Sequence, residues 1–299
     1  MPELRFEGKV AIVTGAGHGL GRSHALLLAA RGASVVVNDL GGTLEGAGAS
    51  PAPAEEVVKL IADNGGRAVA STDDVTTPEG ARAIVTTALD AFGAADILVN
   101  NAGILRDRSF GKMSVEEFDA VLAVHVRGAF LVTRAVFGHM KERGYGRIVN
   151  TSSPSGLFGN FGQANYATAK MGLVGLTKTL AIEGTRAGIK ANAIAPLAWT
   201  RMTDALLPAE LEARLTPGRV SALVAFLCHE ECPVTGEVFS VGGGRVARVF
   251  VAEGPGWRKE DHTVEDIRDN WQAITAEQPY LTPTALGEQS GASLQAMLD

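Results

Sequence analysis

Short apolar runs alternate with longer helical patterns along most of this 299-residue chain. The runs are continuous, which is typical of parallel strands covered on both faces. They predict strands at Val10–Val13, Ser34–Val37, Arg67–Ala70, Asp96–Val99, Arg147–Val149, Lys190–Ile194 and Val238–Val241. Between them, the pattern predicts helices near 20–31, 54–64, 78–92, 114–142, 163–186 and 217–229. This alternation indicates an α/β fold, a doubly wound parallel sheet of Rossmann-like type.

The pattern changes after Val241. The glycines 242–244 break the last strand, and the residues beyond them contain one weak helical pattern near 264–274. This segment is too short to bury a core of its own. The sequence therefore predicts a single domain over residues 1–244 and a C-terminal extension over 245–299, packed on the domain or on a partner subunit.

Two predicted helices are apolar on more than one side. Between 121 and 140, His125, Arg127, Arg134 and a few small polar residues interrupt the apolar side chains, and the helix over 163–183 carries two apolar stripes. A helix that is apolar all round must be buried on more than one side. One side can pack on the sheet, so we expect the other to pack on a second subunit, in a homodimer or a dimer of dimers.

Composition and charge exclude several classes of protein. Charged residues make up 20% of the chain and the formal net charge is −6, whereas nucleic-acid binding requires a basic face. The N-terminus is polar and lacks the apolar core of a signal peptide. No run of about 18 uncharged apolar residues occurs, so we expect no membrane-spanning helix.

Cysteine usage points to a reducing compartment. Two cysteines, Cys228 and Cys232, cannot form a disulfide framework, and we expect a cytoplasmic protein. Together with His229 they offer too few ligands for a zinc site, which normally has four. The end of a helix is the simpler interpretation, and no metal is predicted.

A glycine-rich turn follows the first predicted strand and opens a helix. Gly15, Gly19 and Gly21 fit the pattern T-G-x-x-x-G-x-G, while the commoner G-x-G-x-x-G fails because its third position is Leu20. Such glycines allow a tight turn and close approach of a diphosphate, and the helix N-terminus donates amide hydrogen bonds to it. A purely structural turn is the alternative while the motif stands alone.

An acidic residue ends the next strand, eighteen residues after Gly21. The carboxylate of Asp39 can accept hydrogen bonds from the adenosine ribose hydroxyls and would repel a 2′-phosphate. No arginine or lysine directly follows it, and His18 in the glycine turn is mostly neutral. The sequence therefore favours NAD over NADP, with an ordinary strand-end cap as the alternative for Asp39.

Three residues form a candidate catalytic set: Ser153 at a strand end, Tyr166 near a helix start, and Lys170 one turn further. A free tyrosine has a pKa of about 10, which is too high for efficient proton exchange near neutrality. A neighbouring ammonium would lower that pKa. Ser153 can hold the substrate oxygen, so that hydride passes between the substrate carbon and a nicotinamide while Tyr166 handles the proton.

These motifs, with Asn100-Asn101-Ala102-Gly103, resemble those of the short-chain dehydrogenase/reductase superfamily. The resemblance implies that Asn101, Ala102 and Gly103 support the cofactor, that Asp74 and Val75 lie by the adenine, and that Pro196 begins the loop on the nicotinamide side. His125 stands where the superfamily has an asparagine in its proton relay. It is either a catalytic residue of a subgroup or a satisfied buried histidine.

A closer resemblance is to the dehydrogenase part of peroxisomal multifunctional enzyme type 2. It rests on the segments Asn38–Gly42, Asn101–Asp107, Gly159–Tyr166, Ile182–Gly184, Ile194–Pro196, Arg201–Thr203 and Cys228–Glu230. That resemblance implies oxidation of (3R)-3-hydroxyacyl-CoA to 3-ketoacyl-CoA with NAD, as in β-oxidation, by a homodimer. A separate hydratase would supply the substrate.

Two alternatives remain. The same mechanism could act on a hydroxysteroid or on a steroid side-chain hydroxyacyl-CoA, because the substrate loop carries generic apolar residues such as Trp199, Leu206 and Leu207. A catalytically silent NAD-binding regulator would be expected to lack one of the three catalytic residues. A CoA ligand would seek cations at the pocket mouth, and the candidates are Arg106, Arg108, Lys112 and Arg201.

Overall fold

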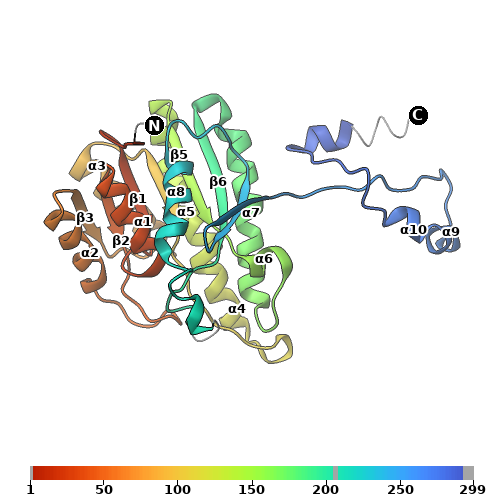
Figure 1. Cartoon of the computed structure of the whole chain (residues 1–299), viewed down its shortest axis with the longest axis horizontal. Helices are drawn as coiled ribbons and strands as arrows, with labels where there is room; N and C mark the ends of the chain where they lie inside the picture. Colours follow the sequence, from red (N-terminus) through yellow and green to blue (C-terminus); the bar gives the residue numbers. More distant parts are fainter. Residues whose placement is uncertain (1–2, 205–207, 292–299) are drawn as a thin grey trace. The chain divides into compact units, whose positions relative to one another are not determined.

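The computed structural model describes residues 3–204 and 208–291, and compactness divides the chain into two units, up to Arg248 and from Val249. In the first unit, the described strands form one eight-stranded sheet in the order β3-β2-β1-β4-β5-β6-β7-β8 (Figure 1). Their bounds are β1 (Val10–Thr14), β2 (Ser34–Asn38), β3 (Arg67–Ser71), β4 (Ile97–Asn100), β5 (Gly146–Thr151), β6 (Ile189–Pro196), β7 (Val238–Gly242) and β8 (Arg245–Val249). β1 to β7 pair in parallel, which confirms the predicted fold class.

Helices cover both faces of this sheet (Figure 1). One face carries α1 (Gly19–Ala30), α2 (Ala52–Asp63) and α8 (Pro217–Cys228), and the other carries α3 (Pro78–Phe92), α5 (Ala129–Arg143) and α7 (Ala164–Gly184). Along β1, Ala11 and Val13 belong to the first core, and Val10 and Ile12 to the second. Because successive strand residues point to opposite faces, a strand buried on both must be apolar throughout.

The order of the strands reverses between β1 and β4, which lie side by side although β2 and β3 separate them in sequence. Ligands of open α/β sheets bind outside the carboxyl ends of the strands at such a switch point. The two turns that leave β1 and β4 are the glycine-rich turn and the Asn101–Gly103 turn. Both predicted cofactor motifs therefore lie at the same edge of the sheet.

The long apolar helix predicted over 114–142 is a continuous helical run with one irregular turn. It consists of α4 (Val115–Leu122), a π-helical turn (Ala123–Gly128) and α5. The run is long and apolar enough to cross a membrane by length and composition. Val132, Val136 and Met140 of α5 are fully buried in the core on the sheet, so packing within the domain explains much of this apolarity.

The sequence pattern predicts neither α6 (Pro154–Phe158) nor β8. It predicts that the glycines after β7 end the sheet. Gly243 and Gly244 instead have positive φ angles of 58° and 86°, the conformation that a two-residue hairpin turn requires at both central positions. They therefore join β7 to a further edge strand.

The second unit contains α9 (Val264–Asp269) and α10 (Trp271–Ile274), where the weak helical pattern was predicted. The rings of Phe250 and Tyr280 stack with centroids 5.9 Å apart, and the backbones of Glu253 and Leu281 exchange two hydrogen bonds. None of its described residues is buried within the chain. Packing of this extension on the domain or on a partner stays a prediction.

Candidate active site

A cavity of about 620 Å³ opens at the carboxyl ends of the strands, a size suited to a small-molecule or cofactor site. It is lined by every predicted catalytic and cofactor-binding residue except Gly21: Gly15, His18, Gly19, Leu20, Asp39, Asp74, Val75, Asn101, Ala102, Gly103, His125, Ser153, Tyr166, Lys170 and Pro196. The structure thus brings together residues from eight separate segments of the chain. Asp73, Thr151 and Ser152 also line it, and no sequence motif singled them out.

The glycine-rich turn is shaped for close approach of a ligand. Gly15 and Gly19 have positive φ angles of 63° and 51°. A Cβ on Gly21 would lie 2.1 Å from the carbonyl oxygen of Gly15, so Gly21 permits the turn from beneath and does not face the cavity. α1 begins at Gly19, and the first amides of a helix have no partner within it. This cradle fits a dinucleotide diphosphate.

Asn101 supports the glycine-rich turn. Its side-chain amide donates to the carbonyl oxygens of Thr14 and Gly15 at 3.1 and 3.0 Å. The hydroxyl of Thr14 in turn accepts from the backbone amides of Asn101 and Ala102. The turns after β1 and β4 are therefore fixed to each other.

The carboxylate of Asp39 is held by two backbone amides. One oxygen accepts from the Gly17 amide and the other from the Gly41 amide, each at 2.7 Å. Each carboxylate oxygen can accept two hydrogen bonds, so both keep one acceptor site for a ligand. Gly41 has a φ of 74°, and a Cβ there would lie 1.9 Å from the Ser50 carbonyl oxygen. A side chain at position 41 would displace the amide that holds Asp39.

The catalytic set lies together above β5. The Tyr166 and Lys170 side chains share one face of α7, with the lysine Nζ 5.3 Å from the tyrosine ring centroid. The Lys170 ammonium donates to the carbonyl oxygen of Thr151 at 2.6 Å. Ser153 caps α6, and its hydroxyl accepts from the Ser155 amide at 3.2 Å. Ser153 and Lys170 are both buried.

The prediction that Lys170 lowers the Tyr166 pKa below its usual value is wrong for the protein by itself. Burial raises the pKa of Tyr166 to about 12, although the hydrogen bond from Ser153 lowers it. Burial also lowers the pKa of Lys170 to about 7, so the lysine carries only part of its charge near neutrality. Desolvation disfavours the charged form of both groups, and it is the largest cause of each shift.

We expect Lys170→Met to stabilise the protein most below pH 7. There, lysine is protonated in both states, and the folded state bears the full penalty of a buried charge. Between pH 7 and about 10.4 the folded lysine is neutral while the unfolded lysine still binds a proton, so the penalty shrinks as pH rises. Thermal unfolding at pH 6, 8 and 10 measures this, with Lys178→Met on the same helix as control. A difference in Tm between Lys170→Met and the wild type that stays constant with pH would contradict this prediction.

Cations at the cavity mouth separate into two groups. Arg106 and Arg201 line the cavity, and the Nε of Arg106 donates to the Glu45 carbonyl oxygen at 3.0 Å. Arg108 instead forms an ion pair with Glu117, with Nε and Oε1 3.1 Å apart. Neither Arg108 nor Lys112 lines the cavity. Sequence alone could not separate these four candidates.

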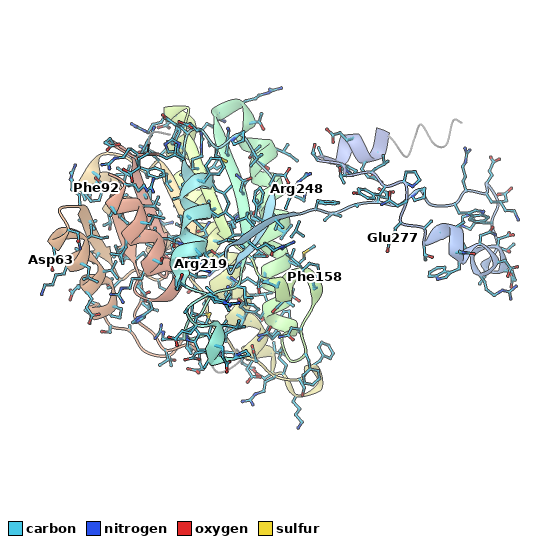
Figure 2. The ribbon with its side chains drawn as sticks, in the orientation of Figure 1. Asp63, Phe92, Phe158, Arg219, Arg248 and Glu277 are labelled. Carbon is cyan, nitrogen blue, oxygen red and sulfur yellow. The ribbon has the colours of Figure 1, made fainter. Side chains whose placement is uncertain are left out.

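The apolar residues predicted for the substrate loop are not found among the described residues that line the cavity. Trp199 is absent from its lining, and Leu206 and Leu207 lie outside the described residues. Leu197 and Met202 of the same segment do line it. Phe158, at the end of α6 (Figure 2), is 77% exposed and does not line it either.

The cysteine cluster is part of the core. Cys228 ends α8 and Cys232 follows shortly after, and both are fully buried free thiols. Within residues 3–204 and 208–291, no group of three or more histidine, cysteine or acidic side chains could hold a metal ion.

The chain is similar to several known proteins, and residues 9–210 match the short chain dehydrogenase family. A short-chain type dehydrogenase/reductase of Mycobacterium tuberculosis is 55% identical over 90% of this chain and 94% of its own. The peroxisomal multifunctional enzyme type 2 of Mus musculus is 48% identical over 98% of this chain, which spans only 40% of that enzyme. The hydroxyacyl-CoA dehydrogenase ChsB1 of M. tuberculosis is 41% identical over 92% of each protein.

Solved structures agree with these matches. Full-length peroxisomal multifunctional enzyme type 2 from Drosophila melanogaster has a TM-score of 0.83 at 40% identity, covering 98% of this chain and 50% of its own. A 7α-hydroxysteroid dehydrogenase complexed with NADH and a 7-oxo bile acid has a TM-score of 0.74 at 31% identity, covering 82% of this chain and 98% of its own. Both resemblances drawn from the motifs are confirmed. The chain therefore belongs to the short-chain dehydrogenase family, and it is an NAD(P)-linked oxidoreductase.

Proposed function

We propose that this enzyme oxidises (3R)-3-hydroxyacyl-CoA to 3-ketoacyl-CoA with NAD. The observation that carries the proposal is the single cavity that joins Asp39, the Ser153-Tyr166-Lys170 set and the cations Arg106 and Arg201. Asp39 suits a dinucleotide, the Ser153-Tyr166-Lys170 set suits a secondary alcohol, and the two arginines suit an anionic carrier. The similarity to a hydroxyacyl-CoA dehydrogenase over nearly its full length supports the choice of substrate.

The preference for NAD over NADP rests on Asp39. Its carboxylate is fixed by the Gly17 and Gly41 amides at the cavity wall, where a ribose hydroxyl can donate to it. A 2′-phosphate at the same place would be repelled by the Asp39 carboxylate. This carboxylate cannot rotate away, because backbone amides hold both of its oxygens. This supports NAD as the cofactor.

The chemistry assigns one task to each side chain. Bound NAD would accept the hydride from the substrate carbon. Tyr166 receives the hydroxyl proton of the alcohol, and Ser153 holds the reacting oxygen by a hydrogen bond while itself contacting Tyr166. Lys170, fixed by the Thr151 carbonyl, places a positive charge beside Tyr166 when it is protonated. That charge opposes the burial that raises the Tyr166 pKa, and in this way it favours the phenolate form that takes the proton.

A CoA thioester is supported by the charge at the cavity mouth. The Nε of Arg106 donates to the backbone carbonyl oxygen of Glu45, which fixes the arginine side chain. The other N–H groups of the guanidinium remain available to a ligand. A planar guanidinium suits bidentate phosphate recognition. Free steroids lack the phosphates that such a group would bind.

A hydroxysteroid or a steroid-derived hydroxyacyl-CoA is the second candidate. Similarity to a 7α-hydroxysteroid dehydrogenase, at 31% identity over 82% of the chain, favours it. The same Ser153, Tyr166 and Lys170 chemistry would serve either substrate. A silent NAD-binding regulator is not proposed, because the three catalytic side chains lie together in a cavity of the family's type.

NADH formation with a substrate panel tests the proposal. The panel contains medium-chain (3R)- and (3S)-hydroxyacyl-CoA, a sterol-derived hydroxyacyl-CoA and free hydroxysteroids, each with NAD and with NADP. We expect the highest kcat/KM for a (3R)-hydroxyacyl-CoA with NAD. Activity confined to free hydroxysteroids would contradict the CoA substrate, and a preference for NADP would contradict the cofactor.

We also propose a homodimer that forms through α5 and α7. Phe130 of α5 and Met171 and Ile182 of α7 are 45%, 42% and 55% exposed, and a Cβ on Gly175 would have no neighbour within 4 Å. Sedimentation at micromolar concentration should show a dimer or a multiple of it. Met171→Arg should shift it towards monomer, while Phe110→Arg, at an 84% exposed site outside these helices, should not. A wild-type monomer would contradict the proposal.

The proposed substrate implies a preceding reaction. A (3R)-3-hydroxyacyl-CoA arises when a hydratase adds water to an enoyl-CoA, so a separate hydratase is the proposed pathway neighbour. The two buried free thiols support the cytoplasm as the proposed compartment, because disulfides persist mainly in oxidising ones. Fractionation of the host cell would test this location.

A further inference from the structure

His125 lies in the π-helical turn between α4 and α5 and is 2% exposed. Single π-helical turns within α-helices are frequent at functional sites. A Cβ on Gly103 would lie 2.3 Å from the imidazole Cε1, so the glycine leaves the room that the ring occupies. The imidazole also meets the Tyr166 ring edge to face, with centroids 5.2 Å apart. His125 thus contacts both the turn after β4 and the catalytic tyrosine.

The Nε2 atom of His125 faces the backbone of Ile104. It lies 3.1 Å from the amide nitrogen and 2.9 Å from the carbonyl oxygen of that residue. Ile104 is buried, and no other acceptor for its amide is found among the described residues. A buried N–H without an acceptor is rarer and less tolerated than a carbonyl without a donor. Nε2 is therefore the acceptor, and the ring proton belongs on Nδ1.

Two buried polar atoms without partners in the described residues belong to side chains that line one small cavity. Neither His125 Nδ1 nor Asn100 Oδ1 has a hydrogen-bond partner within the described chain. Both residues line a cavity of about 10 Å³, which also touches Thr14 and Gly128. That volume is about the minimum for one water molecule. A water there can accept from Nδ1–H and donate to Oδ1, which satisfies both groups.

The Asn100 side chain leads away from the site into the core. Its side-chain nitrogen donates to the Thr133 hydroxyl at 3.0 Å and to the side-chain oxygen Oδ1 of Asn150 at 2.9 Å. Asn150 donates in turn to the hydroxyl of Thr177 at 2.9 Å. These buried bonds connect β4 and β5 with α5 and α7. An imidazole tied to Asn100 is therefore tied to the helix that carries Tyr166.

We propose that His125 is a positioning residue: a neutral imidazole protonated at Nδ1, which holds Ile104 directly and Asn100 through one buried water. In this arrangement it fixes the turn after β4 and the ring orientation of Tyr166. It exchanges no proton with substrate. A buried, hydrogen-bonded group in a fully satisfied network gives a single well-defined geometry.

The charged form of His125 is disfavoured, although the hydrogen bond with the Ile104 backbone opposes this effect. Burial and the nearby Lys170 ammonium hold the pKa of His125 well below its usual range. Lys170 and Tyr166, both from α7, are the titratable groups that face the ring. The turn 101–104 brings no titratable residue, and neither do Thr14 of β1 and Asn100 of β4. We therefore expect no titration of His125 between pH 5 and pH 9.

The first test is the tautomer, which needs no turnover. Protein labelled with ¹⁵N-histidine is followed by NMR from pH 5 to pH 9, and His125 is assigned by the signals lost in His125→Gln. We expect the Nδ1–H tautomer with shifts that do not move. An Nε2–H tautomer, or a titration midpoint inside this range, would overturn the proposal.

The second test is kinetic, and this arm alone rests on the proposed function. His125→Phe keeps a ring but loses the hydrogen bonds to Ile104 and to the water. We therefore expect kcat to fall at least about tenfold, while the KM for hydroxyacyl-CoA stays within about twofold. The acid limb of the pH profile of kcat should also move. His125→Gln, which can still accept from the Ile104 amide, should recover part of kcat. His139→Phe is the matched control, because its Nε2 accepts from the Ala95 amide at 3.3 Å outside the cavity.

Unchanged kcat and pH profile in His125→Phe would overturn the positioning role. If the wild-type enzyme oxidises none of the panel substrates, the proposed function fails while the NMR result still decides the state of His125. The two failures are therefore distinguishable.

Discussion

Tyr166→Phe should lower kcat by about 10³-fold while NAD binds as in the wild type. General acid–base catalysis contributes about 10²–10⁴-fold, and Phe removes the one hydroxyl that can exchange the substrate proton. Because Phe keeps the ring, the edge-to-face contact with His125 at 5.2 Å is preserved. Steady-state NADH formation measures kcat, and titration of the intrinsic fluorescence or calorimetry measures NAD affinity.

The chain supplies a matched control for this loss. Tyr145 is also half-buried, its hydroxyl has no hydrogen-bond partner among the described residues, and it lies outside the cavity. Tyr145→Phe should therefore leave kcat within about twofold of the wild type. A Tyr166→Phe enzyme that keeps more than a tenth of its turnover would remove the proton-transfer role from this residue.

Asp39→Ala should weaken NAD binding on the order of 10²-fold and improve NADP binding. Hydrogen bonds to a charged acceptor contribute about 1.5–3 kcal/mol each, and about 2.7 kcal/mol corresponds to 10²-fold. The same change removes the charge that would repel a 2′-phosphate. Direct titration with both dinucleotides measures the two affinities and their ratio.

Two further variants separate ribose recognition from loop support, because Asp39 also accepts from the Gly17 and Gly41 amides. Asp39→Asn keeps one oxygen for an amide but loses the charge, so it should relax the NAD preference with a smaller loss of NAD affinity. Asp63→Ala, at the exposed end of α2 (Figure 2), should change neither. Equal NAD affinity in Asp39→Ala and wild type would reject the ribose contact.

Much of the fold was predictable because the spacing of apolar residues along each segment indicates whether it forms a strand or a helix. β1 and β2 are apolar at every position from Val10 to Val13 and from Val35 to Val37, as strands buried on both faces must be. β8 was missed because its exposed, arginine-containing residues pair at the sheet edge and bury little. The π-helical turn at His125 was missed too, since no periodicity distinguishes it from the helices beside it.

By itself, the sequence determined most of the segments that become strands and helices, that Tyr166 and Lys170 share a helix face, and that a glycine turn precedes an acidic strand end. These are local properties, set by spacing along one element. The tertiary structure alone decided that Gly17 and Gly41 hold Asp39, that burial raises the Tyr166 pKa, that Arg106 and not Arg108 lines the cavity, and that His125 fills the space above Gly103. Each of these depends on desolvation or on contact between residues distant in the chain, and local spacing carries no information about either.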